Sequence, residues 1–284
     1  MRYFCLLLLL ELLGATASYA QAPKTCPYDS ARFNLFRPVP RTQLRPLRPD
    51  RPGTTESPFT VDAGHLQVEM DALRLINTRE DEQRSREWKA AYTVVKLGLS
   101  RRTDVQLEVP LYKVQKEKEA TEADWQRQTG FGDLTFRLKH NFLGDDQEGP
   151  VAVAVVAYTR LPTGGQAGSG AMEGGLIVPV NVELPHRWNL DVQLEADLNY
   201  EREIGHHYVR MMPSIALDHE FTEVFSFLIE GVTQWDAAHS GWRSSVNLAP
   251  IITINENLQL DLGTHLALSR AADREFFFGF TFRR

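Results

Sequence analysis

Apolar and polar residues alternate with a period of two along the chain from Gly64 to its end. In the run from Leu190 to Tyr200, apolar side chains alternate with three carboxylates, a glutamine and an asparagine. Successive side chains of a strand point to opposite faces, so this run has one apolar and one polar face. Its length matches the roughly 9–11 residues with which a tilted strand crosses a bilayer. About twelve such stretches predict an all-β fold, a transmembrane antiparallel up-and-down β-barrel.

We expect the strands approximately at 65–76, 90–100, 104–112, 132–142, 151–161, 175–184, 189–201, 208–221, 225–235, 242–254, 258–268 and 276–282. The connectors alternate in length: those at 77–89, 113–131 and 162–174 are long, and those at 101–103, 185–187, 222–224 and 255–257 are short. Short periplasmic turns and longer external loops are the rule in bacterial outer-membrane barrels. A water-soluble exported barrel shows the same alternation with its faces reversed, but the strand number and the loop asymmetry favour the membrane form.

The first twenty residues predict a secretory signal peptide. Arg2 precedes an apolar run from Tyr3 to Leu13, which Glu11 interrupts. This run is shorter than the ~20 residues of a transmembrane helix. We therefore expect cleavage after Ala20 or Ala22 and export to the bacterial outer membrane. Residues 64–284 would form the barrel.

Cysteine content and net charge exclude two further possibilities. Cleavage removes Cys5 and leaves Cys26 as the single cysteine, so no internal disulfide is possible. The net charge of −6 argues against a nucleic-acid partner, which requires a basic face. The partners we expect are outer-membrane lipid and a small-molecule substrate.

Residues 23–63 form a separate region rich in proline and arginine. Proline at this density blocks both helices and strand ladders, so the region is expected to be an extended tail. One interpretation is a disordered periplasmic linker. The other is a plug whose arginines meet an acidic barrel interior, and its candidate residues are Arg48, Asp50, Arg51 and Glu56.

Three motifs carry a resemblance to a known family. They are the stretch from Arg48 to Val61 leading into Gly64–Glu69, the run Gly130–Leu134 with Lys139, and the run Tyr158–Gly164. Together they resemble the outer-membrane β-barrel family of transporters of the meta-pathway of phenol degradation. The resemblance covers nearly all of the mature chain. It implies an outer-membrane barrel without catalytic residues or a cofactor.

If the apolar faces point to lipid, the polar faces line the interior, and carboxylates outnumber bases there. The candidate lumen-lining residues are Glu69, Asp71, Glu108, Asp133, Arg137, Lys139, Glu183, Asp191, Glu195, Asp197, Asp218, Glu220, Glu230 and Asp261. Clustered carboxylates in a low-dielectric wall favour cations over anions. They could equally solvate a water-filled lumen or pair with the arginines of the tail. About twelve strands predict a narrow or plugged lumen, since eight-stranded barrels are filled and 16–18-stranded porins are open.

Other candidate sites are weak. The glycine-rich run Gly164–Gly170 lacks the lysine and serine or threonine of a phosphate loop, and we expect a flexible external loop. His206 and His207 lie in another predicted outer loop, where adjacent histidines are usually solvated, so we predict no metal site. His140 and His219 have no serine at a diagnostic spacing, which places catalysis below transport.

The most probable function from sequence is a channel or transporter for small molecules, including hydrophobic or aromatic ones. The alternatives are a structural or surface-interaction barrel with a plugged lumen and, below it, an outer-membrane hydrolase.

Overall fold

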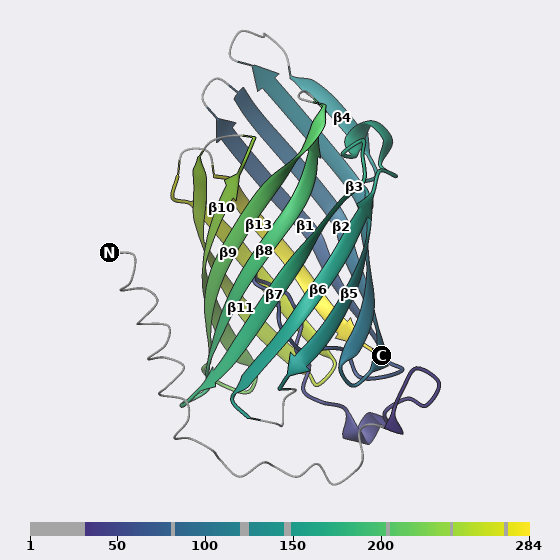
Figure 1. The fold of residues 1–284 in the computed structure, drawn as a ribbon. Helices are drawn as coiled ribbons and strands as arrows, with labels where there is room; N and C mark the ends of the chain where they lie inside the picture. The colour runs from purple at the N-terminus through teal and green to yellow at the C-terminus, as the bar shows by residue number, and fades with distance from the viewer. Residues whose placement is uncertain are drawn as a thin grey trace, which may run out of the picture.

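Thirteen antiparallel strands form one sheet in the computed structural model (Figure 1). The structure describes residues 32–284 except 81–82, 120–124, 145–148, 203–204, 239–240 and 270–271, so the predicted signal peptide and Cys26 lie outside the described residues. The strands are β1 (Leu66–Glu80), β2 (Gln83–Ser100), β3 (Thr103–Glu119), β4 (Gln126–Gly130), β5 (Leu134–Leu143), β6 (Val151–Leu161), β7 (Glu173–Leu184), β8 (Trp188–Glu201), β9 (His206–Glu220), β10 (Phe225–Asp236), β11 (Trp242–Asn255), β12 (Leu258–Ala267) and β13 (Arg274–Arg283). Two short 3-10 helices, η3 (Arg41–Gln43) and η4 (Gly165–Ala167), complete the elements. Within the described ranges, no helix has the length and apolar character to cross a membrane.

The sheet closes on itself through its first and last strands. Gln67 of β1 lies opposite Arg283 of β13, and the pairing continues to Asn77 opposite Arg274. β2 pairs with both β1 and β3, which completes the ring. The result is a closed twelve-stranded antiparallel barrel with one extra strand, and the predicted fold class is confirmed.

The extra strand is β4, which lies inside the stretch 113–131 that the sequence predicted as an outer connector. β4 and β5 pair with the same edge of β3, opposite Lys113–Glu117 and Thr103–Glu108 respectively. They therefore follow one another along that edge, with residues 131–133 between them. The extra strand lengthens the wall at one end and adds no position around the barrel.

Three strands also extend further than predicted at the same end. β1 continues to Glu80, β2 begins at Gln83 and β3 continues to Glu119, so most of the predicted loop 77–89 is strand. Apart from Trp88 and Val114 these extensions are polar, so they lack the period-two apolar signal. Backbone ladder bonds hold them whatever the side chains are, as where Asn77 lies opposite Arg86.

The two faces of the wall differ as a membrane barrel requires. Along β8, Gln193 is fully buried whereas its neighbour Leu194 is 59% exposed, and along β10 Glu230 is 1% exposed beside Ile229 at 49%. Polar side chains thus point inward and apolar ones outward. A water-soluble barrel has the reverse arrangement, so that alternative is wrong.

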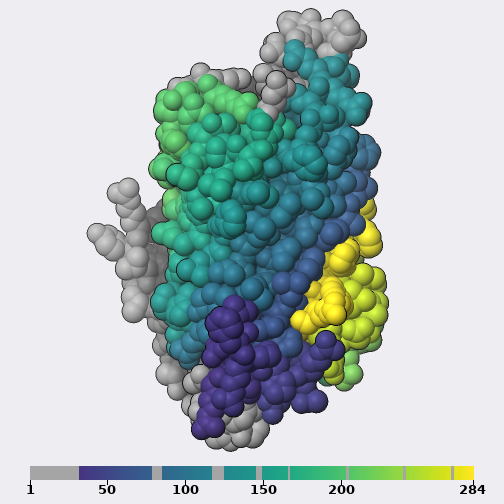
Figure 2. Space-filling view, turned by 90° about the vertical axis from the view of Figure 1, so that its right-hand side faces the viewer, coloured from purple at the N-terminus to yellow at the C-terminus, as the bar shows by residue number. Residues whose placement is uncertain are grey.

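The residues before β1 form a loop that enters the barrel from one end. Arg45 closes the base of this inner loop, which we define as residues 45–62. Its backbone N and Nε donate to the Asp62 carboxylate at 3.0 and 2.7 Å, and its Nη2 donates to the Thr60 carbonyl at 2.7 Å. Arg283 at the end of β13 donates to the Arg45 carbonyl at 2.8 Å. Both ends of the loop therefore lie at the short-turn end of the barrel (Figures 1 and 2), where the first described residues bond to the end of β2, as Asn34 does opposite Ser100.

Gly98 of β2 is the position where the base of the inner loop comes closest to the wall. A Cβ atom there would lie 2.1 Å from the Asp62 carbonyl oxygen and 2.5 Å from that of Val61. We expect Gly98→Ala to destabilise the packed loop by about 1–3 kcal/mol, as overpacking does elsewhere. Limited proteolysis at residues 45–62 measures this as faster cleavage. Gly231→Ala is the matched control, because its Cβ would meet only Ile215 at 3.7 Å; equal cleavage of the two variants would contradict the expectation.

Candidate functional site

Asp50 lies at the centre of a buried charge cluster inside the barrel. Its carboxylate accepts hydrogen bonds from Lys139 Nζ at 2.7 and 2.9 Å, and from Lys96 Nζ. The two lysines are only 1% and 3% exposed. Burial by itself raises the pKa of Asp50, but Lys139, Lys96 and Arg137 outweigh it and hold the pKa well below its ordinary value. Asp50 is therefore ionised at any physiological pH.

Arg51, the next residue, pairs with carboxylates on two other strands. Its Nη1 donates to Asp71 of β1, and its Nε and Nη2 donate to Asp261 of β12 at 3.0 and 2.5 Å. The backbone N–H groups of Asp50 and Arg51 donate to the Glu69 carboxylate at 3.3 and 3.2 Å. Burial lowers the pKa of Arg51, and the two aspartates raise it above its ordinary value. The Asp50–Arg51 pair thus bridges positive and negative parts of the wall.

The next residues of the inner loop bind the wall through backbone and side chain. Thr54 and Thr55 donate their N–H groups to the Glu230 carboxylate, with distances of 2.5 to 2.9 Å. The hydroxyls of Thr55 and Ser214 are 2.7 Å apart. Glu56 pairs with Arg137. Strands β1, β2, β5, β9, β10 and β12 therefore all hold the loop.

The predicted lumen residues that belong to strands lie on the inward faces of those strands. Glu69, Asp71, Arg137, Lys139, Glu230 and Asp261 contact the inner loop as described above. Glu108 accepts hydrogen bonds from Arg137 at 2.6 Å and Tyr92 at 2.7 Å. Asp197 accepts from Tyr158 at 2.5 Å and Arg210 at 2.8 Å, and Glu195 accepts from Gln193 at 3.0 Å.

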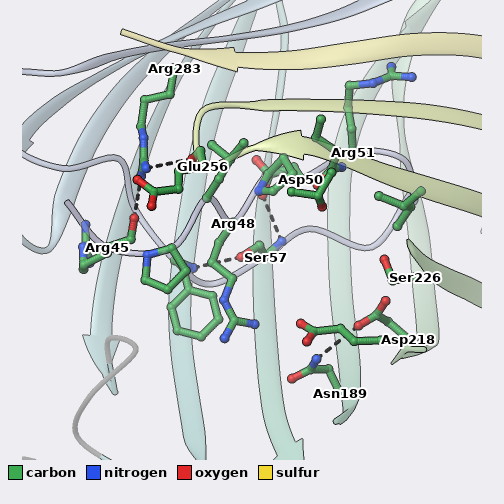
Figure 3. Close-up of a pocket in the computed structure, with 18 of the residues that line it drawn as sticks. Arg45, Arg48, Asp50, Arg51, Ser57, Asn189, Asp218, Ser226, Glu256 and Arg283 are labelled. Carbon is green, nitrogen blue, oxygen red and sulfur yellow. Dashed lines mark hydrogen bonds between the residues drawn. The ribbon is translucent and has the colours of Figure 1, made fainter. Parts of the chain in front are cut away.

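A cavity of about 810 Å³ lies between the inner loop and β7 to β12, at the short-turn end (Figure 3). Asp191, Asp218 and Glu220 line it. Asn181 and Asn189 donate to Asp191 and Asp218, at 2.9 and 3.1 Å. These carboxylates face the cavity rather than the central charge cluster.

Arg48 and Glu183 meet at the rim of this cavity. Arg48 Nη2 lies 3.0 Å from Glu183 Oε1, with the two side chains 28% and 41% exposed. Figure 3 shows the guanidinium groups of Arg48 and Arg51 on opposite sides of the loop. Of the predicted plug residues, Asp50, Arg51 and Glu56 are thus in the charge cluster, and Arg48 is at its margin.

Sequence reasoning missed several inward bases, which balance part of the acidic excess. Arg210 donates to Asp197, Arg160 to Glu173 at 2.9 Å, and Arg74 to Glu275 at 2.6 Å. Arg160 and Arg210 are separated by an even number of residues from the other inward side chains of their strands, so the period-two pattern could have identified them. Arg74 could not, because an irregularity in the pairing of β1 with β13 between Asp71 and Leu73 reverses the phase.

Asp133 is the predicted lumen residue that lies outside the strands. It lies between β4 and β5, and its carboxylate accepts hydrogen bonds from Gly164 N at 2.7 Å and from Ser169 N and Oγ at 2.6 and 2.9 Å. Burial raises its pKa, but these hydrogen bonds dominate and lower it. Arg202 donates to the Gly165 and Gly168 carbonyls, both at 2.9 Å. The glycine-rich run, which the sequence predicted to be flexible, is therefore held by hydrogen bonds from both Asp133 and Arg202.

We expect Asp133→Ala to release this glycine-rich loop. Hydrogen bonds to a charged acceptor contribute about 1.5–3 kcal/mol each, so losing them exposes the Gly164 and Ser169 amides to local opening. Hydrogen exchange at these amides should accelerate by at least about tenfold. Arg202→Ala tests the other side, and unchanged exchange in both variants would contradict the assignment.

The predicted outer-loop histidines have ordinary partners. β9 begins at His206, and His207 Nε2 lies 2.7 Å from the Met172 carbonyl oxygen and packs against the Tyr200 ring. In the part of the chain that the structure describes, no group of three or more histidine, cysteine or acidic side chains is arranged to hold a metal ion.

Comparison with known proteins agrees with this geometry. A crystal structure of an outer membrane channel from Pseudomonas putida F1 superposes with a TM-score of 0.58 at 14% identity, covering 82% of this chain and 98% of that chain. The NanC porin gives a TM-score of 0.47 at 9% identity, covering 75% and 98%. At 14% identity the likeness to the Pseudomonas putida channel shows the fold alone. No curated protein matches the sequence.

A match to a family model shows which family the chain belongs to. The family described as "Putative MetA-pathway of phenol degradation" matches residues 49–283, which span most of the inner loop and the whole barrel. Apart from Arg48, the motifs that carried the resemblance lie in this range, and the recognition is confirmed. The chain belongs to this family of outer-membrane β-barrels.

Proposed function

We propose that this protein is an outer-membrane channel for small molecules that its own inner loop closes at rest. The observation that carries the proposal is the buried contact between the loop and most strands of the wall, with the Asp50–Arg51 pair at its centre; these strands include β1, β2, β3, β5, β8, β9, β10 and β12. The short turns mark the periplasmic end. The loop enters from that end and plugs the lumen there.

The construction of the loop supports displacement rather than permanent filling. Its contacts to the wall are mainly ion pairs and hydrogen bonds, whereas its buried hydrophobic residues Phe59 and Val61 lie near its base. Polar contacts can exchange for water or for a ligand with little net cost. We therefore place the moving part at residues 46–57 and the anchor at the base that Arg45 and Asp62 close.

Aromatic compounds are the first substrates to test, because the family description names phenol degradation. The function is proposed to be non-enzymatic. His140 Nδ1 lies 2.9 Å from the Thr103 hydroxyl, and the His219 ring stacks on Trp188 at 4.2 Å. Neither histidine has a serine partner among the described residues, which supports transport over hydrolysis.

Single-channel recording of the mature protein in planar bilayers, with a salt gradient, tests the proposal. We expect the wild-type protein to be mostly silent with rare openings, and the openings to be cation-selective because inward carboxylates exceed inward bases. Steady conductance of the wild-type protein would contradict closure by the loop. A folded, heat-modifiable barrel that stays silent when the loop is released would favour the structural or surface-interaction alternative.

A further inference from the structure

Lys139 and Asp261 of the wall have their direct ion-pair partners in the inner loop. Lys139 Nζ contacts Asp50, Glu56 and the Ser57 carbonyl, all of which belong to the loop. Asp261 is paired with Arg51. Both wall residues are buried, at 1% and 2% exposed. Among the described residues, neither has another direct hydrogen bond or ion pair, although Asp104 of β3, the ladder partner of Lys139, also attracts it electrostatically.

The other charged wall residues in the cluster keep partners of their own. Lys96 also pairs with Glu69, Arg137 with Glu108, and Asp71 with Arg74. Withdrawal of the loop would therefore leave one cation and one anion facing the lumen without a direct partner. A ligand that carries both complementary charges can form charge-assisted hydrogen bonds to them in place of the loop.

We propose that Lys139 and Asp261 form a dipolar binding site, occupied at rest by the Asp50–Arg51 pair as an internal ligand. The ligand of this site is a small zwitterion that carries a carboxylate and a guanidinium or ammonium group. Two adjacent residues of the loop span the site, so the two charged groups of the ligand are separated by about the reach of two neighbouring side chains. This inference rests on the proposed channel function and names its substrate class.

The Glu69 and Glu230 carboxylates add specificity to this site. In the closed state Glu69 accepts the backbone N–H groups of Asp50 and Arg51, and Glu230 accepts those of Thr54 and Thr55. A ligand with N–H donors near its charged groups satisfies the same acceptors. Monovalent ions of either sign satisfy only one half of the site.

The test uses the rate at which the loop can be cross-linked to the wall. In full-length Thr55→Cys/Ser214→Cys protein with Cys26→Ser, disulfide formation requires the loop in place, since the native hydroxyls are 2.7 Å apart. The probe is N-acetyl-Asp-Arg-amide, which carries the two side-chain charges of the internal ligand. The matched probes are N-acetyl-Asp-Gln-amide and N-acetyl-Asn-Arg-amide, each with one of these charges.

We expect the zwitterionic probe to slow cross-linking at a concentration at least about tenfold lower than either single-charge probe. In Asp261→Asn protein the zwitterionic probe should lose its advantage over N-acetyl-Asp-Gln-amide. In Lys139→Gln protein it should lose its advantage over N-acetyl-Asn-Arg-amide. Arg187→Gln, at a turn of the barrel, should leave the ranking of the three probes unchanged.

Equal potency of the three probes on the parent protein would overturn the inference, and this comparison needs no variant of the site to fold. Conductance of the same protein separates the two proposals. If release of the loop opens a pore but the zwitterion has no advantage, the dipolar site fails and the channel stands. If the zwitterion displaces the loop but no current appears, the channel fails and the site stands.

Discussion

Replacing Arg51 with alanine is expected to raise the open fraction of the channel more than any other single substitution in the inner loop. The substitution leaves Asp261 buried without its partner and removes a contact of Asp71. Removing one partner of a buried ion pair costs about 3–5 kcal/mol of stability in proteins. The closed state loses this energy, which corresponds to a shift of at least about a hundredfold toward the open state. Single-channel recordings should show frequent openings where the wild-type protein is mostly silent.

Arg48→Ala is the matched control for this prediction. Arg48 carries the same side chain three residues earlier, but its pair with Glu183 is partly exposed. Such pairs contribute about 0–1 kcal/mol, so the open fraction should change by a factor of only a few. Equal effects of the two substitutions would show that the buried pairs of Arg51 do not hold the loop. A silent Arg51→Ala barrel would count against the channel itself.

A disulfide between the loop and the wall is expected to abolish the openings that Arg51→Ala produces. Thr55 and Ser214 are both buried and their hydroxyl oxygens are 2.7 Å apart, near the roughly 2.05 Å that a disulfide requires between its sulfurs. In Cys26→Ser protein, cysteines at both positions should therefore oxidise readily. The covalent bond then holds the loop in the lumen even though the Arg51 pairs are missing.

Conductance before and after reduction checks this prediction in one preparation. Oxidised Arg51→Ala protein with both cysteines should be silent, and a reducing agent should restore its openings. The two single-cysteine proteins are the controls, because neither can form the bond and neither should respond to reduction. Conductance that persists in the oxidised protein would mean that ions pass beside the loop and that the loop is no plug.

The alternation of apolar and polar residues by itself determined the fold of this protein. It predicted the strand-by-strand order, the antiparallel pairing and the inward orientation of residues such as Glu230 and Gln193. A strand has only two faces, and the face that contacts lipid must be apolar. The polar ends of β1, β2 and β3 were missed, because backbone hydrogen bonds continue the strands there although the apolar pattern has ended. The phase change after Asp71 was also invisible, since one extra residue reverses the faces without altering the composition.

The partners inside the lumen were decided by the tertiary structure. The sequence indicated that an arginine-rich segment and an acidic interior could meet, but on sequence alone it favoured a disordered linker. Which arginine would be buried depends on where the loop turns, and only the closed barrel brings Asp71 and Asp261, which lie 190 residues apart in the chain, onto Arg51. The same closure brings Lys139 and Asp50 together. The local pattern specifies the wall, whereas the long-range geometry specifies which charged side chains pair inside the lumen.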